Sequence, residues 1–146
     1  MLSATWVDAD TLESQPGATA DADLFTGDDA ADVADGLAGD DFLFGEGGND
    51  ILSGGAGDDL LDGGSGTDVA DYSSAPAGVT VDITLTGPQD TGSAGVDTLT
   101  NIEGVQGSAH DDTFAFSNPT ASATYSVDGG GGSNLLDLGQ FNQADA

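Results

Sequence analysis

The chain has 146 residues and a formal net charge of −27, made up of 27 acidic residues, no lysine, no arginine and one histidine. This charge excludes nucleic acid as a direct partner, because phosphate binding depends on lysine and arginine, and no segment has the apolar length needed for insertion into a membrane. Cysteine is absent, so disulfides do not hold the fold, and the length is typical of one domain.

Residues 1–17 precede the regular part of the chain. They contain Trp6, Val7 and Leu12, but they have neither the basic region nor the apolar core of a secretory signal peptide. We expect this segment to be a lead-in or a cap for the structure that follows.

A nine-residue repeat occupies residues 18–72, and residues 54–62 (GGAGDDLLD) and 63–71 (GGSGTDVAD) are its clearest copies. Position six is always aspartate, at Asp23, Asp32, Asp41, Asp50, Asp59 and Asp68. Position eight is always apolar, at Phe25, Ala34, Leu43, Leu52, Leu61 and Ala70. A fixed period of this kind predicts one structural unit stacked on itself.

Each repeat position has a chemical reason. Six glycine-rich residues followed by a three-residue strand reverse the chain twice in every two repeats, so aspartates two repeats apart stack on the same edge. Carboxylates about 4.8 Å apart repel each other unless a divalent cation lies between them. Calcium suits that gap because it accepts several oxygen ligands, including backbone carbonyls. Position eight points inward and forms a thin aliphatic core.

This pattern resembles the calcium-binding repeat-in-toxin (RTX) family, whose nonapeptide is Gly-Gly-x-Gly-x-Asp-x-U-x. The resemblance is strong over residues 18–72 and looser beyond them. It implies an all-β fold, a right-handed parallel β-roll or β-solenoid with calcium-binding glycine-rich turns and several Ca²⁺ ions. It also implies a secreted bacterial protein, extracellular or at the cell surface, that leaves by type I secretion.

The resemblance also implies the ligands, since each calcium in the family takes an aspartate and two backbone carbonyls from each of two stacked turns. One site would combine Leu37, Gly39 and Asp41 with Gly54, Ala56 and Asp59. A second site, on the opposite edge, would combine Glu46, Gly48 and Asp50 with Gly63, Ser65 and Asp68. By the same rule Asp28, Ala30 and Asp32 would join Gly45, Gly47 and Asp50, and Asp23 would join Gly36, Ala38 and Asp41. Residues 18–35 depart from the pattern, because the copy at 18–26 lacks its glycines and Ala30 and Ala31 replace the usual residues.

The acidity of the chain agrees with a metal-dependent fold. Self-repulsion at this net charge destabilises a compact state, and a metal that binds only the folded chain contributes its binding free energy to folding. A disordered solubilising tail or a salt-adapted surface would explain the charge alone. The strict nine-residue phase and the inward apolar positions argue against both.

Residues 73–146 predict an irregular continuation with fewer metals, so that residues 1–146 form one β-solenoid domain. Residues 79–85 alternate as in a half-buried strand, residues 87–90 give a turn signal, and residues 121–127 alternate again before a run of four glycines. The Asp-x-apolar signature returns at residues 97–99 and 112–114 and as Asn-Leu-Leu at 134–136. No segment shows a sustained helical period.

Position seven is apolar although it should point away from the core. Leu24, Phe42 and Leu60 fall in one ladder, with Phe44 nearby. Either Trp6, Val7 and Leu12 of the lead-in, or the C-terminal segment, cover this ladder, or it is an interface. Solenoid ends also leave backbone groups unpaired, and no amphipathic helix is available to cap them.

We expect an extracellular calcium-binding structural module of a surface layer, matrix, filament or adhesin, which forms a homo-oligomer or polymer and contacts acidic polysaccharide through calcium bridges. The alternative is an auxiliary secretion and folding module of a larger hydrolase, protease or epimerase. We expect no enzyme. Ser108, His110 and Asp112 contain the residue types of a catalytic triad, but residues two apart in a tight turn rarely meet in that geometry.

Overall fold

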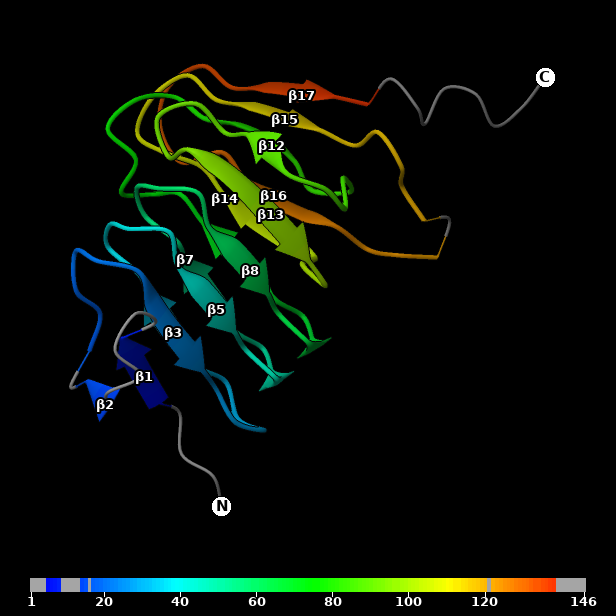
Figure 1. Ribbon diagram of the computed structural model, residues 1–146. Helices are drawn as coiled ribbons and strands as arrows, with labels where there is room; N and C mark the ends of the chain where they lie inside the picture. The colour runs from blue at the N-terminus through cyan, green and yellow to red at the C-terminus, as the bar shows by residue number, and fades with distance from the viewer. Residues whose placement is uncertain (1–4, 9–13, 16, 121, 139–146) are drawn as a thin grey trace.

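The computed structural model describes residues 5–8, 14–15, 17–120 and 122–138. Seventeen short strands make up the regular secondary structure of that part of the chain. Most strands are three residues long and pair in parallel with the strand of the next turn. Figure 1 shows the result as a stack of turns that runs from the N-terminal to the C-terminal end. None of the described segments forms a helix long and apolar enough to cross a membrane.

The first sheet has the order β12-β13-β8-β5-β3-β1-β2. Its parallel strands are β3 (Asp23–Thr26), β5 (Phe42–Phe44), β8 (Leu60–Asp62) and β13 (Val96–Thr100). The register aligns Leu24 with Phe42 and Phe42 with Leu60, as the nine-residue period predicts. The antiparallel strands β12 (Gln89–Asp90), β1 (Thr5–Asp8) and β2 (Ser14–Gln15) extend the two ends of this sheet.

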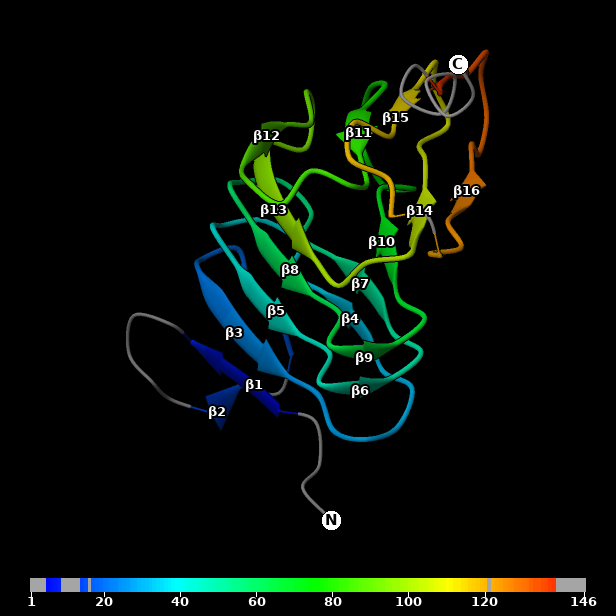
Figure 2. The same cartoon turned by 90° about the vertical axis from the view of Figure 1, so that its right-hand side faces the viewer.

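The second sheet faces the first across the core (Figure 2). Its order is β16-β14-β10-β7-β4, with β4 (Val33–Asp35), β7 (Ile51–Ser53), β10 (Val69–Asp71), β14 (Gly104–Gln106) and β16 (Ser126–Asp128). A third parallel sheet holds β11 (Thr80–Asp82), β15 (Thr113–Ala115) and β17 (Leu135–Asp137). Within the turns, β6 (Gly47–Gly48) pairs with β9 (Ser65–Gly66).

The core lies between the sheets and contains the whole position-eight column, which confirms its inward orientation. Every position-eight side chain from Phe25 to Ala70 is buried. The second half continues this core with Val79, Val81, Leu99 and Phe114. Apolar burial stabilises the stack by about 25 cal/mol per Å², but the column is only one side chain wide in each turn.

The irregular half differs in detail from the sequence expectation. The strand expected at 79–85 is only β11, because the chain turns after Asp82, whose carbonyl accepts the Leu85 N–H (3.2 Å). Gln89 and Asp90 lie in β12 and not in a turn. The alternation at 121–127 yields only β16, because a turn closed by the Ala123 N–H and the Thr120 carbonyl precedes it.

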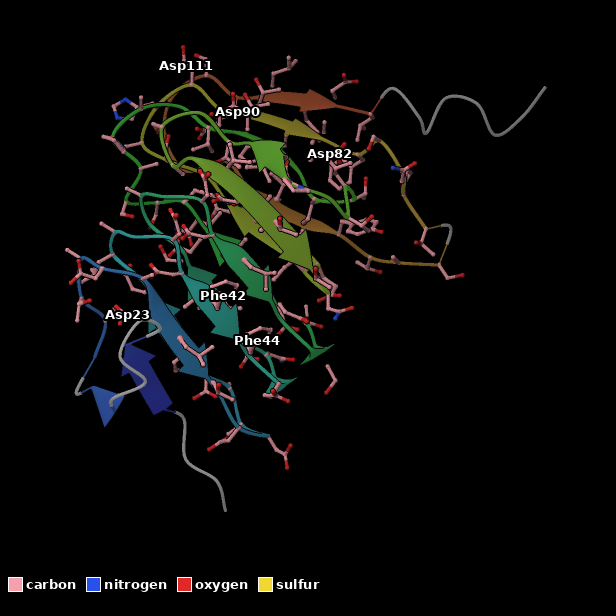
Figure 3. All side chains as sticks on the ribbon, viewed as in Figure 1. Asp23, Phe42, Phe44, Asp82, Asp90 and Asp111 are labelled. Atoms are coloured by element: carbon pink, nitrogen blue, oxygen red, sulfur yellow. The ribbon has the colours of Figure 1, made fainter. Side chains whose placement is uncertain are left out.

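In the described part of the chain the ladder of Leu24, Phe42 and Leu60 is only partly exposed. Phe42 is 45% exposed and Leu24 and Leu60 are half-buried, and Figure 3 shows Phe42 and Phe44 along β5. On the second sheet, the position-seven residues Ile51 and Val33 are 39% and 75% exposed. Strand β1, which holds Trp6 and Val7, pairs with the edge of β3, while Leu12 lies outside the described residues. At the N-terminal end of the first sheet, β1 and β2 therefore supply the strand pairing that a bare solenoid end would lack.

Candidate metal centre

Two ladders of carboxylates run along the edges of the stack, one residue from each turn. On one edge the N–H of Asp23 donates to Oδ1 of Asp41 (2.7 Å), that of Asp41 to Asp59 (2.8 Å) and that of Asp59 to Asp97 (3.2 Å). On the other edge the N–H of Asp32 donates to Asp50 (2.8 Å), that of Asp50 to Asp68 (2.8 Å) and that of Asp68 to Oε2 of Glu103 (2.9 Å). Each carboxylate thus fixes the turn before it in the chain.

Asp23, Asp41, Asp50, Asp59, Asp68 and Asp97 are buried, whereas Asp32 and Glu103 are half-buried. Asp41, Asp50, Asp59 and Asp68 each accept the ladder hydrogen bond through Oδ1 alone. The oxygens left without a hydrogen-bond partner in the described part of the chain are Oδ2 of Asp41, Asp50, Asp59 and Asp68, and Oδ1 of Asp23. An unpaired buried carboxylate oxygen carries the full cost of its lost hydration. The sequence has no lysine or arginine that could supply a positive charge, and its one histidine, His110, belongs to the turn at residues 108–112. A cation from solution would supply the missing counter-charge.

The free oxygens lie against the position-one glycines. A methyl group at Gly36 would collide with Oδ2 of Asp41 and would come within 2.6 Å of the Gly54 carbonyl oxygen. The same contacts occur at Gly45, whose neighbours are Oδ2 of Asp50 and, at 2.7 Å, the Gly63 carbonyl oxygen. Glycine at position one therefore leaves room where a carboxylate and a carbonyl of the next turn converge. Such a set of hard oxygens suits a calcium ion.

The turn backbone brings further carbonyls to the edge. Leu37 has a φ of 73° and Glu46 a φ of 68°, a left-handed conformation that is uncommon outside glycine. The Leu37 carbonyl accepts the Ala56 N–H (3.1 Å), and the Glu46 carbonyl accepts the Ser65 N–H (2.9 Å). Each carbonyl oxygen has a second lone pair, so these predicted ligands keep capacity for a metal.

A model of the RTX calcium-binding nonapeptide repeat, described as four copies, matches residues 18–52 and again residues 35–70. Residues 18–70 belong to the RTX calcium-binding repeat family. RTX repeats bind calcium and are typical of secreted bacterial proteins. A search of curated proteins found no match to the chain.

The described residues contain no cluster of three or more aspartate, glutamate or histidine side chains that could hold a metal alone. Side chains would therefore supply only part of each predicted site. The remaining ligands would be backbone carbonyls, as the resemblance implies for Gly39, Gly48, Gly54 and Gly63. The assignment of individual ligands stays a prediction, and the free carboxylate oxygens are its strongest support.

The first two RTX copies, which depart from the motif, are arranged differently. Oδ2 of Asp32 accepts the N–H of Asp28 (2.9 Å), and Oδ1 of Asp28 accepts the N–H of Ala30 (2.8 Å). In the copy before, Oδ2 of Asp23 accepts both the N–H (2.6 Å) and the hydroxyl (3.0 Å) of Thr19. Protein donors thus occupy oxygens in these two turns that are free in the regular ones, although Asp23 keeps one free oxygen.

The electrostatics of the regular sites favour a bound cation. Burial raises the pKa of Asp41 to about 6 and that of Asp59 to about 7, and neighbouring carboxylates add to the rise against the opposing backbone hydrogen bond. Burial also raises the pKa of Asp50. Without metal, each carboxyl group resists ionisation. A divalent cation reverses that preference because it stabilises the charged form.

The serine, histidine and aspartate of residues 108–112 do not meet in triad order. The Ser108 hydroxyl donates to Oδ1 of Asp112 (2.8 Å), and His110 contributes its backbone N–H to the Ser108 oxygen (3.0 Å). A nucleophilic serine would instead donate to the imidazole. These contacts close a turn.

Proposed function

We propose that this chain is an extracellular, non-catalytic calcium-binding structural module whose RTX roll folds when calcium fills the gaps between stacked aspartates. The observation that carries the proposal is the set of buried carboxylate oxygens without a hydrogen-bond partner. In a chain with a net charge of −27 and no basic side chain other than one histidine, such oxygens oppose folding until cations reach them. Calcium binding to the folded state alone then supplies folding free energy.

We further propose that the folded module assembles with copies of itself. Support comes from the exposed position-seven side chains, of which Phe42 and Ile51 are 45% and 39% exposed. Among the described strands, β4 also ends the second sheet, and an edge strand of this kind can pair with another chain. Calcium must bind first, because chains of this charge repel at contact distance.

Far-UV circular dichroism of the calcium-stripped chain, followed during calcium titration, tests the folding proposal. The β signal of residues 18–71 should appear with calcium and be lost again on chelation. Magnesium at the same concentration is the control, because it demands a tighter octahedral site and retains its waters, and it should restore much less signal. A spectrum unchanged by complete removal of calcium would end the proposal.

A further inference from the structure

The two halves of the stack satisfy their buried carboxylates in different ways. Among the described residues, all the buried side-chain oxygens that lack a partner belong to residues 23–68. Beyond residue 72 the described ladder positions are Asp97, Glu103, Asp112 and Asn134. Glu103 is half-buried and its Oε2 accepts the Asp68 N–H, whereas both polar side-chain atoms of Asp97, Asp112 and Asn134 have protein partners. These contacts show what replaces the cation.

Asp97 continues the ladder of Asp41 and Asp59, yet its second oxygen is occupied. Oδ1 accepts the Asp59 N–H as in the regular turns, while Oδ2 accepts the hydroxyls of Tyr72 and Thr91, both at 3.0 Å. Tyr72 is 5% exposed and Thr91 is fully buried. Two neutral donors therefore point at the oxygen that is free in Asp41 and Asp59.

Asn134 also takes the place of a cation, but here the side chain is the donor and backbone carbonyls are the acceptors. It holds position six of residues 129–137, a complete nonapeptide in which asparagine replaces aspartate. Oδ1 accepts the Asp112 N–H (2.9 Å), as a ladder aspartate would. Nδ2 donates to the carbonyls of Gly129 (2.7 Å) and Gly131 (2.9 Å). The RTX pattern assigns the carbonyls of positions one and three to calcium. The Asn134 amide group therefore occupies the place that the cation would take.

Asp112, between these two, is also satisfied by the chain. Oδ1 accepts the Val79 N–H and the Ser108 hydroxyl, both at 2.8 Å, and Oδ2 accepts the Ser108 N–H at 2.9 Å. A calcium ion would have to displace these donors. The second half therefore fits a metal-free stack and does not fit calcium.

We infer that the calcium sites end at the turns of Asp59 and Asp68, and that hydroxyl and amide donors of Tyr72, Thr91, Ser108 and Asn134 replace calcium from residue 72 to residue 138, so that this half keeps its fold without calcium. The inference rests on the proposed calcium-dependent folding of residues 18–71. It divides one continuous core into a metal-dependent and a metal-independent part.

Amide hydrogen exchange of the full chain, read by mass spectrometry in calcium and after calcium removal, tests the division. Removal should abolish protection in peptides from residues 36–62 and retain most of it in peptides from 96–115. Loss of protection in both parts would overturn the inference and leave the proposed function standing. Protection of both parts without calcium would overturn the proposed function and support the metal-free turns.

A double substitution checks the replacement itself. Tyr72→Phe with Thr91→Val leaves Oδ2 of Asp97 buried and unpaired, so residues 96–115 should lose at least about tenfold in exchange protection without calcium and recover with it. Tyr125→Phe, which removes a phenol away from the ladder, is the control.

A second substitution tests the amide. Asn134→Asp should raise the number of bound calcium ions, whereas Ser133→Asp adds the same charge one residue earlier and should not. Unchanged protection in the double variant, together with unchanged calcium number in Asn134→Asp, would contradict the assignment.

Discussion

Single residues carry the proposed metal dependence, because a buried, ionised carboxylate with one free oxygen needs a positive charge beside it. In the regular RTX turns that oxygen belongs to Asp41, Asp50, Asp59 and Asp68. The repeat predicted these four residues from sequence, since position six and the stacking of alternate turns follow from the period alone. The donors to Asp97 escaped prediction, because Tyr72 lies 25 residues before it and Thr91 six residues before it, outside any repeat position.

Asp59→Ala should weaken calcium binding far more than a substitution that removes the same charge elsewhere. Outer-shell changes at metal sites already cost roughly 10–100-fold in affinity, so loss of a ligand should shift the calcium midpoint by at least about tenfold. Asp29→Ala is the control, since Asp29 is exposed. Asp62 is a poorer control, because its carboxylate accepts the Gly64 N–H and the Asn101 amide. Equal midpoints for the two variants would show that Asp59 is no ligand.

The raised pKa values of Asp41 and Asp59 predict that acid partly replaces calcium. Their folded-state values are about 6 and about 7, above the value of about 3.9 for a free aspartate. Because these pKa values are raised, the protonated carboxyl groups of Asp41 and Asp59 stabilise the folded state fully below pH about 4. That stabilisation is lost as the pH rises through 6 and then 7. The calcium-stripped chain should gain β signal in circular dichroism between pH 7.5 and 4.5. A signal that falls on acidification would contradict the ladder electrostatics.

At the scale of the repeat element, the glycine turns position the predicted calcium ligands and the three-residue strands carry the core. The period predicted the register of β3, β5 and β8 and the burial of Leu43, Leu52 and Leu61, because a nine-residue repeat fixes which side chain points inward. It could not predict where β11 ends or where β16 begins. Those limits depend on contacts made by Asp82 and Thr120 after the period has been lost.

Gly54→Ala should disrupt the calcium turn, because a methyl group there would collide with the Asp59 carboxylate. We expect a loss of roughly 1–3 kcal/mol of stability in calcium, the usual cost of overpacking, and a higher calcium midpoint. Gly87→Ala is the matched control, since nothing lies within 4 Å of a methyl group at Gly87, and it should change stability by less than about 0.5 kcal/mol. Chemical denaturation in calcium measures both. Equal stability of the two variants would mean that position one is not a metal cradle.

For the whole molecule, charge and exposed apolar surface act in sequence. In the proposed assembly, the net charge of −27 keeps metal-free chains apart, and calcium would both fold the RTX half (residues 18–71) and lower the repulsion between chains. Only then can the position-seven ladder make contact. Assembly should therefore be cooperative in calcium.

Phe42→Asp should block this association and leave the monomer folded, because Phe42 is 45% exposed on β5. Sedimentation velocity at high calcium should show oligomers for the unmodified chain and a monomer for the variant, with equal circular dichroism spectra. Thr67→Asp adds the same charge at an exposed turn position and should still associate. If the unmodified chain stays monomeric over a wide concentration range, the ladder of Leu24, Phe42 and Leu60 is not an interface.

The central claim is that calcium binding supplies the folding free energy of the RTX half, residues 18–71. The most direct test is the thermal unfolding midpoint of the full chain, measured as a function of free calcium. Each site that binds only the folded state adds about 2.7 kcal/mol when calcium is a hundredfold above its dissociation constant. We predict that the unfolding midpoint of the RTX half rises steeply and continuously with calcium and only slightly with magnesium. A midpoint independent of calcium would contradict the account.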